Sequence, residues 1–174
     1  ATVRARRPVT AGQGSQSSRP PTSVGAGAPA SGKNLYPRWA FKDLLEKQAV
    51  DVVVPDLPKR CGPSAGKKIA NMAEVYYVPL APHNVCGPLG TMASAHVCAS
   101  IPNFLIQENF DDSAEPWTWD LLQGVPRVQD GYLTVPDTPG WGVELNEEEA
   151  EKHPYSEVYF LRLFEEGWET RKPA

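Results

Sequence analysis

The 174-residue sequence predicts an α/β protein with a parallel sheet and helices outside it. Two observations predict this class. Between residues 36 and 106, segments with helical periodicity alternate with short apolar segments. The first apolar segment, 49–54, is almost continuously β-branched, which is typical of a strand buried on both faces of a parallel sheet.

The first helix–strand pair opens this region. A helix is expected over 36–48, where Phe41 and Leu45 lie on one apolar stripe. The strand over 49–54 follows it and ends at Pro55-Asp56.

Two further helix–strand pairs follow in the same order. Each strand again ends close to a polar residue. The expected elements are a helix over 65–75, a strand over 78–81 that ends near His83, a helix over 90–99, and a strand over 103–106 that ends at Glu108.

The chain before this region has a different composition. Residues 1–31 are rich in Gly, Ser, Pro, Ala and Arg and contain no Leu, Ile, Phe, Tyr or Trp, so they bury too little apolar surface to offset their ordering entropy. We expect a disordered tail that the fold does not need. A transit peptide and a frame error in the gene model are the alternatives, because the stretch is rich in Arg and Ser and has no acidic residue.

The chain after this region, residues 111–174, is expected to be a mostly irregular extension. It carries turn signals, a short strand near 132–135 and an acidic run, Glu147–Glu151, that we interpret as a solvated helix face or first turn. Four of the five tryptophans lie here, so much of the extension should pack against the rest of the chain.

Composition excludes several classes of protein. No apolar run is long enough to span a membrane, and no basic face interleaved with aromatic residues indicates nucleic-acid binding. Three cysteines (Cys61, Cys86 and Cys98) without CxxC spacing do not make a disulfide framework. We therefore expect a cytoplasmic protein with reduced thiols and with neither membrane nor nucleic-acid partners.

Asp56, His83 and Glu108 form the candidate site. They lie 27 and 25 residues apart, about one strand–helix unit each, at the ends of successive strands. The carboxyl ends of parallel strands share one edge of a sheet, and neighbouring strands lie about 4.8 Å apart, so these side chains can meet. An Asp beside a His can orient the ring and stabilise its protonated form, which makes the His a better base.

Each of these residues also has a structural interpretation. An Asp or a His that follows a strand often forms a turn or a helix cap. Asp56 before Leu-Pro fits that role, and Glu108 fits a solvated loop position.

The order of short motifs around these residues resembles the mandelate racemase subgroup of the enolase superfamily, and its galactonate dehydratase-like members in particular. The likeness runs from about Ser31 to the C-terminus. The motifs that carry it are Gly-Lys-Asn-Leu-Tyr at 32–36, Val-Pro-Asp-Leu at 54–57, Ala-Pro-His at 81–83, Gly-Pro-Leu-Gly at 87–90, Ile-Pro-Asn at 101–103, Gln-Glu at 107–108 and Pro-Gly-Trp-Gly-Val-Glu at 139–144.

This resemblance implies that residues 32–110 are the C-terminal part of an α/β barrel, with its sixth to eighth strands. It also implies a Mg²⁺-dependent hydro-lyase that removes the proton α to the carboxylate of an acid sugar and eliminates water. By the same resemblance, His83 is the general base, Asp56 is its partner, and Glu108 hydrogen-bonds the substrate or intermediate. Family members are often homo-oligomers.

The sequence departs from the family at the metal site. Lys33 occupies the position of a family Glu that ligates Mg²⁺, and an ammonium group repels a cation. The resemblance places the other metal ligands and the second acid–base group on upstream strands. We therefore expect no metal ligands in this chain, and no turnover by the chain alone.

Two other functions stay open. A racemase or cycloisomerase on the same barrel shares the proton-abstraction step, so His83 and Asp56 do not separate it from a dehydratase. A fragment without catalytic activity that only binds partners is the third possibility.

Overall fold

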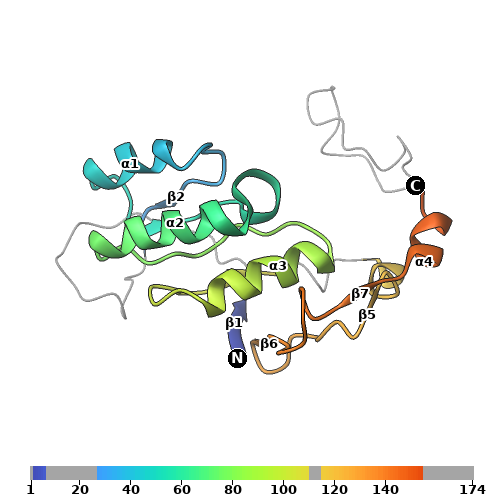
Figure 1. The fold of residues 1–174 in the computed structure, drawn as a ribbon. Helices are drawn as coiled ribbons and strands as arrows, with labels where there is room; N and C mark the ends of the chain where they lie inside the picture. Colours follow the sequence, from blue (N-terminus) through green and yellow to red (C-terminus); the bar gives the residue numbers. More distant parts are fainter. Residues whose placement is uncertain (1, 7–26, 110–114, 155–174) are drawn as a thin grey trace.

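Three helices pack side by side on one face of the molecule (Figure 1). The computed structural model describes residues 2–6, 27–109 and 115–154. The helices are α1 (Trp39–Glu46), α2 (Gly62–Val75) and α3 (Pro88–Ala99), which confirms the three predicted from periodicity. None of the helices within the described ranges is long and apolar enough to cross a membrane.

The strands next to these helices pair in parallel. β2 (Ala30–Ser31) pairs with β3 (Val52–Val53), and single parallel bridges continue the order from Val53 to Leu80 and from Leu80 to Phe104. The helix–strand alternation therefore produces the predicted parallel α/β arrangement. Over the described residues the sheet is open, and it is not a closed barrel.

The main core lies between the sheet and the helices α1 and α2. Val53 and Leu80 from the sheet are fully buried against Phe41 of α1 and Ile69 of α2. Val52 and Val53 are both buried, as expected for a strand covered on both faces. Burial of these side chains is the main favourable contribution to folding here.

The N-terminal residues differ from the sequence prediction. Composition predicts a disordered tail over 1–31, but Thr2–Arg6 form β1, which pairs in parallel with β4 (Gln107–Glu108) and antiparallel with β6 (Tyr132–Thr134). The composition argument concerns side-chain burial, whereas a strand between two others is held by backbone hydrogen bonds. Residues 1 and 7–26 of the predicted tail lie outside the described residues.

The C-terminal extension contains more structure than predicted. Leu133 and Val135, within and just after β6, are buried against Met92 and Ala95 of α3, so this part packs as expected. The extension also contains η3 (Pro116–Trp119), β5 (Leu122–Gln123), β7 (Glu144–Leu145) and α4 (Glu147–Lys152).

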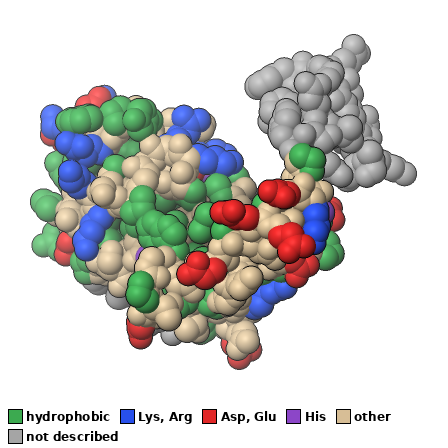
Figure 2. All heavy atoms as spheres, turned by 45° about the vertical axis from the view of Figure 1, so that its right-hand side comes forward, with side chains coloured by type: hydrophobic (Ala, Val, Ile, Leu, Met, Phe, Trp, Pro, Cys, Tyr) green, Lys and Arg blue, Asp and Glu red, His purple; other side chains and the backbone are tan. Residues whose placement is uncertain are grey.

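The acidic run forms the helix α4, which has no buried residue. The Asn146 side chain caps it by accepting a hydrogen bond from Glu149 N at 3.2 Å. On the face drawn in Figure 2, several acidic side chains gather on the side that carries α4, and most Lys and Arg side chains lie on the other side. The interpretation of this run as a solvated helix is confirmed.

Two aromatic residues of α1 test the packing of this helix. Phe41 is 0% exposed and Trp39 is 62% exposed. Phe41→Ala should lower the free energy of unfolding by about 3–5 kcal/mol, because it removes buried surface and leaves a cavity. Trp39→Ala should cost about 1 kcal/mol or less. Urea unfolding followed by circular dichroism measures both, and equal losses for the two variants would contradict this packing.

Candidate active site

Parallel pairing brings the three candidate residues to one edge of the sheet. Asp56 and His83 form a parallel bridge. His83 N donates to Pro55 O at 3.0 Å, and Glu108 N donates to Pro82 O at 3.3 Å. The convergence that the spacing predicts is therefore present.

The imidazole of His83 is paired with Glu108. His83 Nδ1 lies 2.5 Å from Glu108 Oε2, and the two side chains are only 16% and 21% exposed. Because a carboxylate accepts and does not donate, Nδ1 carries the proton and Nε2 keeps its lone pair when the ring is neutral. The arrangement can therefore orient His83 as a base and stabilise the imidazolium that forms.

Asp56 has a different role from the predicted one. Its Oδ1 accepts a hydrogen bond from Lys59 N at 3.0 Å and caps η1 (Leu57–Cys61), a single π-helical turn that leads into α2. The expected side-chain partnership with His83 is replaced by the His83–Glu108 pair. The reason is local, since a capping carboxylate satisfies a backbone N–H of the turn that its own segment forms.

Asn84 belongs to the same site, and no sequence pattern identifies it. Its backbone N donates to Glu108 Oε2 at 2.9 Å, the same oxygen that meets His83. Its Nδ2 donates to Thr91 Oγ1 at 2.8 Å and to Glu108 O at 3.2 Å. Only the residue's position next to His83 in the sequence could have suggested it.

The thiols near the site have little thiolate character. Burial raises the pKa of Cys61 and of Cys86. The Asp56 carboxylate raises the pKa of Cys61 further, whereas the Lys59 ammonium partly offsets the effect of burial on Cys86. Cys98 is buried, which raises its pKa strongly, and its Sγ donates to Gln107 Oε1 at 3.4 Å. A raised pKa keeps a thiol protonated near neutral pH, so these groups are poor nucleophiles.

Lys33 follows β2 and is therefore at the same end of the sheet as the three candidate residues. Its side chain is exposed. Among the residues that the structure describes, no group of three or more His, Cys, Asp or Glu side chains could hold a metal ion. The described residues therefore offer no such cluster for Mg²⁺.

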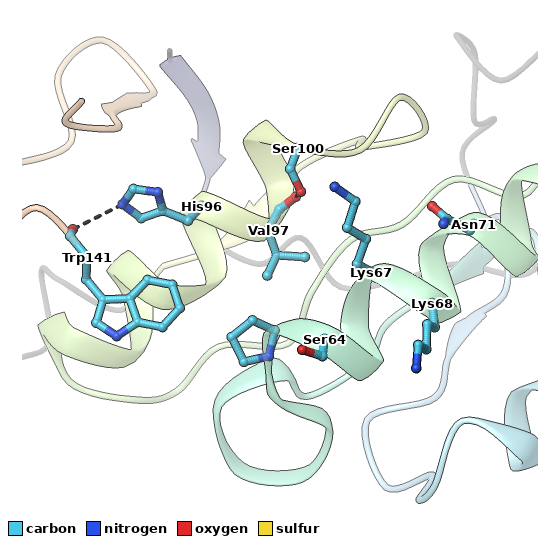
Figure 3. A pocket seen from close by; sticks show the side chains of 9 residues that line it. Ser64, Lys67, Lys68, Asn71, His96, Val97, Ser100 and Trp141 are labelled. Atoms are coloured by element: carbon cyan, nitrogen blue, oxygen red, sulfur yellow. Dashed lines mark hydrogen bonds between the residues drawn. The ribbon is translucent and has the colours of Figure 1, made fainter. Parts of the chain in front are cut away.

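A separate groove lies on the outer helical face, between α2, α3 and Trp141 (Figure 3). Its volume is about 520 Å³, and most of its lining side chains are exposed. His96 borders it and is hydrogen-bonded through Nε2 to Trp141 O at 3.1 Å. The three candidate residues do not line this groove, so it is distinct from the candidate site.

Residues 29–150 match the family model described as Enolase C-terminal domain-like. The chain belongs to this family, and the resemblance to the enolase superfamily is confirmed. Solved structures agree on the fold. A mandelate racemase/muconate lactonizing enzyme-like protein from Rubrobacter xylanophilus is 42% identical with a TM-score of 0.68, over 73% of this chain and 33% of that one.

Two curated relatives are named as dehydratases of acid sugars. A D-xylonate dehydratase of Haloferax volcanii is 43% identical over 124 residues, which are 71% of this chain and 30% of that protein. A D-gluconate/D-galactonate dehydratase of Picrophilus torridus is 32% identical over 139 residues, 80% of this chain and 35% of that protein. The chain thus spans about a third of the length of these relatives.

A further solved structure is similar in fold and carries ligands. It is an enolase from Pantoea ananatis with bound D-gluconate and Mg. It is 31% identical to this chain, with a TM-score of 0.66 over 72% of this chain and 30% of that one.

The cap at Asp56 can be separated from its charge. Asp56→Asn keeps an oxygen that accepts from Lys59 N, so stability should change by a few tenths of a kcal/mol. Asp56→Ala removes the acceptor and should cost about 1 kcal/mol. Thermal unfolding compares the two variants with the unchanged chain. If Asn destabilised the chain as much as Ala, the role of the side chain would be its charge and not its cap.

Proposed function

We propose that this chain supplies the proton-abstracting part of an acid-sugar dehydratase, with His83 as the base. The observation that carries the proposal is the His83–Glu108 pair at the carboxyl edge of the sheet. It occurs in a chain whose relatives are named D-xylonate, D-gluconate/D-galactonate and D-galactonate dehydratases. The substrate class we propose is therefore a sugar carboxylate.

The proposed chemistry follows from the two ring nitrogens. Nδ1 donates to Glu108, so Nε2 accepts the proton from the carbon α to the substrate carboxylate. The electron pair of the broken C–H bond moves into the carboxylate and gives an enediolate. The β-hydroxyl group takes up a proton from the second acid–base group, which the resemblance places on an upstream strand, and leaves as water. The electron pair of the enediolate then forms the carbon–carbon double bond of an enol.

Glu108 has a second oxygen for the substrate. Oε2 accepts from His83 and Asn84, while Oε1 has no hydrogen bond from any residue that the structure describes. We propose that Oε1 meets a substrate hydroxyl group. Asp56 would support the site by capping the turn beside His83.

A metal step is not assigned to this chain. Mg²⁺ in such an enzyme would neutralise the charge of the enediolate, because a carbon acid next to a carboxylate is very weak. The described residues offer no ligand cluster for it, and Lys33 stands at the position of a family ligand by resemblance. We propose that the chain alone does not turn over acid sugars.

A racemase or cycloisomerase is the second candidate function. Structural neighbours are named mandelate racemase/muconate lactonizing enzyme-like, and removal of an α-proton is common to these reactions. Exchange of the α-hydrogen in D₂O without loss of water would favour this candidate over the dehydratase.

The purified chain should give no keto-acid product from D-xylonate, D-gluconate or D-galactonate with added Mg²⁺. Lys33→Glu should not restore activity, because it supplies one carboxylate at most. Product formation above the His83→Ala background would contradict this expectation.

A chimera tests the function itself. Residues 29–150, which match the family model, replace the corresponding segment of the D-xylonate dehydratase from Haloferax volcanii. With Lys33→Glu the folded chimera should dehydrate an acid sugar, and His83→Ala should reduce the rate by about 100-fold or more. A folded chimera without His83-dependent dehydration of any acid sugar would refute the proposed function.

A further inference from the structure

Asn84 is buried between the candidate base and the helix α3. Its side chain is amidic, and the residue is 1% exposed. Burial of an amide is costly unless its polar atoms are hydrogen-bonded. All of them are, because Nδ2 donates to Thr91 Oγ1 and Glu108 O, and Oδ1 accepts from Cys86 N at 3.4 Å.

The backbone of Asn84 acts directly on the site. Asn84 N donates to Glu108 Oε2 at 2.9 Å, and the ring of the preceding residue, His83, meets the same oxygen. Two consecutive residues thus hold one carboxylate oxygen. The second donor fixes which oxygen faces the ring and limits rotation of the carboxylate.

The anchors of Asn84 are themselves buried. Thr91 is 4% exposed and lies on α3, and its carbonyl accepts from Gln107 Nε2 at 3.1 Å. Gln107 is 0% exposed and directly precedes Glu108. The side chain of Asn84 therefore ties the strand end that carries Glu108 to a helix whose position the core sets.

We propose that Asn84 is the positioning residue of this site, which holds the Glu108 carboxylate on His83 Nδ1 and thereby fixes the ring tautomer. The side-chain bonds to Thr91 and Glu108 O place the Asn84 backbone N–H on Oε2. The ring then carries its proton on Nδ1, and Nε2 remains an acceptor. The proposal rests on the proposed role of His83 as the base.

The tautomer can be measured without substrate. Nitrogen-15 NMR of the full chain, at a pH at which the rings are neutral, distinguishes Nδ1–H from Nε2–H imidazole. The chain has three histidines, and His96→Gln and His153→Gln variants assign the His83 signals. Because the readout needs no turnover, a failed dehydratase assay and a failed tautomer prediction are separate results.

Asn84→Ala should lower the His83 ratio of Nδ1–H to Nε2–H tautomer by about tenfold or more. The variant lacks the side-chain bonds that hold the backbone N–H of residue 84 against Glu108 Oε2. Asn71→Ala is the matched control, since Asn71 is an exposed amide on α2, and it should leave the ratio unchanged. An unchanged ratio in a folded Asn84→Ala protein would overturn the proposal.

A second pair of variants covers the case in which Asn84→Ala does not fold. Thr91→Val keeps the side-chain volume but removes the hydroxyl that accepts from Asn84 Nδ2, so it should shift the tautomer in the same direction. Thr91→Ser keeps the hydroxyl and should preserve the tautomer. If Thr91→Val leaves the tautomer unchanged, or if it also abolishes the native fold, Asn84 is a structural residue and the proposal is wrong.

Discussion

The register of the parallel strand ends is the constraint on which the site depends. Val53 pairs with Leu80, Leu80 pairs with Phe104, and Asp56 pairs with His83. A shift of one residue in any of these strands would turn its side chains to the other face. The buried apolar side chains of the same strands prevent that shift, so the core that stabilises the fold also sets the positions of His83 and Glu108.

Within this frame, a buried polar network determines which groups meet. One oxygen of Glu108, Oε2, meets both the ring of His83 and the backbone N–H of Asn84. The side chains of Asn84 and Gln107 connect this group to α3 by donating to Thr91. Such a network stabilises only when its members are satisfied, since a buried donor without a partner costs about 1–3 kcal/mol. The arrangement therefore favours one geometry of the carboxylate and the ring, which is the requirement for a base of defined orientation.

Elements with a strong periodic pattern could be predicted from the sequence, as could the edge of the sheet where polar residues gather. The repeated strand–helix length brings Asp56, His83 and Glu108 to one edge of the sheet through backbone pairing, regardless of the contacts that their side chains make. The partner of His83 could not be predicted, because two carboxylates near the ring each have more than one possible donor. The Asp56 carboxylate caps its own turn at Lys59, and Glu108 takes the ring. Thr2–Arg6 likewise pair through backbone groups, which composition does not report.

Glu108, and not Asp56, holds the ring of His83 in this structure. Nitrogen-15 NMR of the His83 ring in two variants of the full chain tests it most directly. Glu108→Ala should release the ring from the Nδ1–H tautomer, whereas Asp56→Asn, which keeps the cap, should leave that tautomer in place. A tautomer that changes with Asp56→Asn and persists in Glu108→Ala would show that Glu108 does not hold the ring.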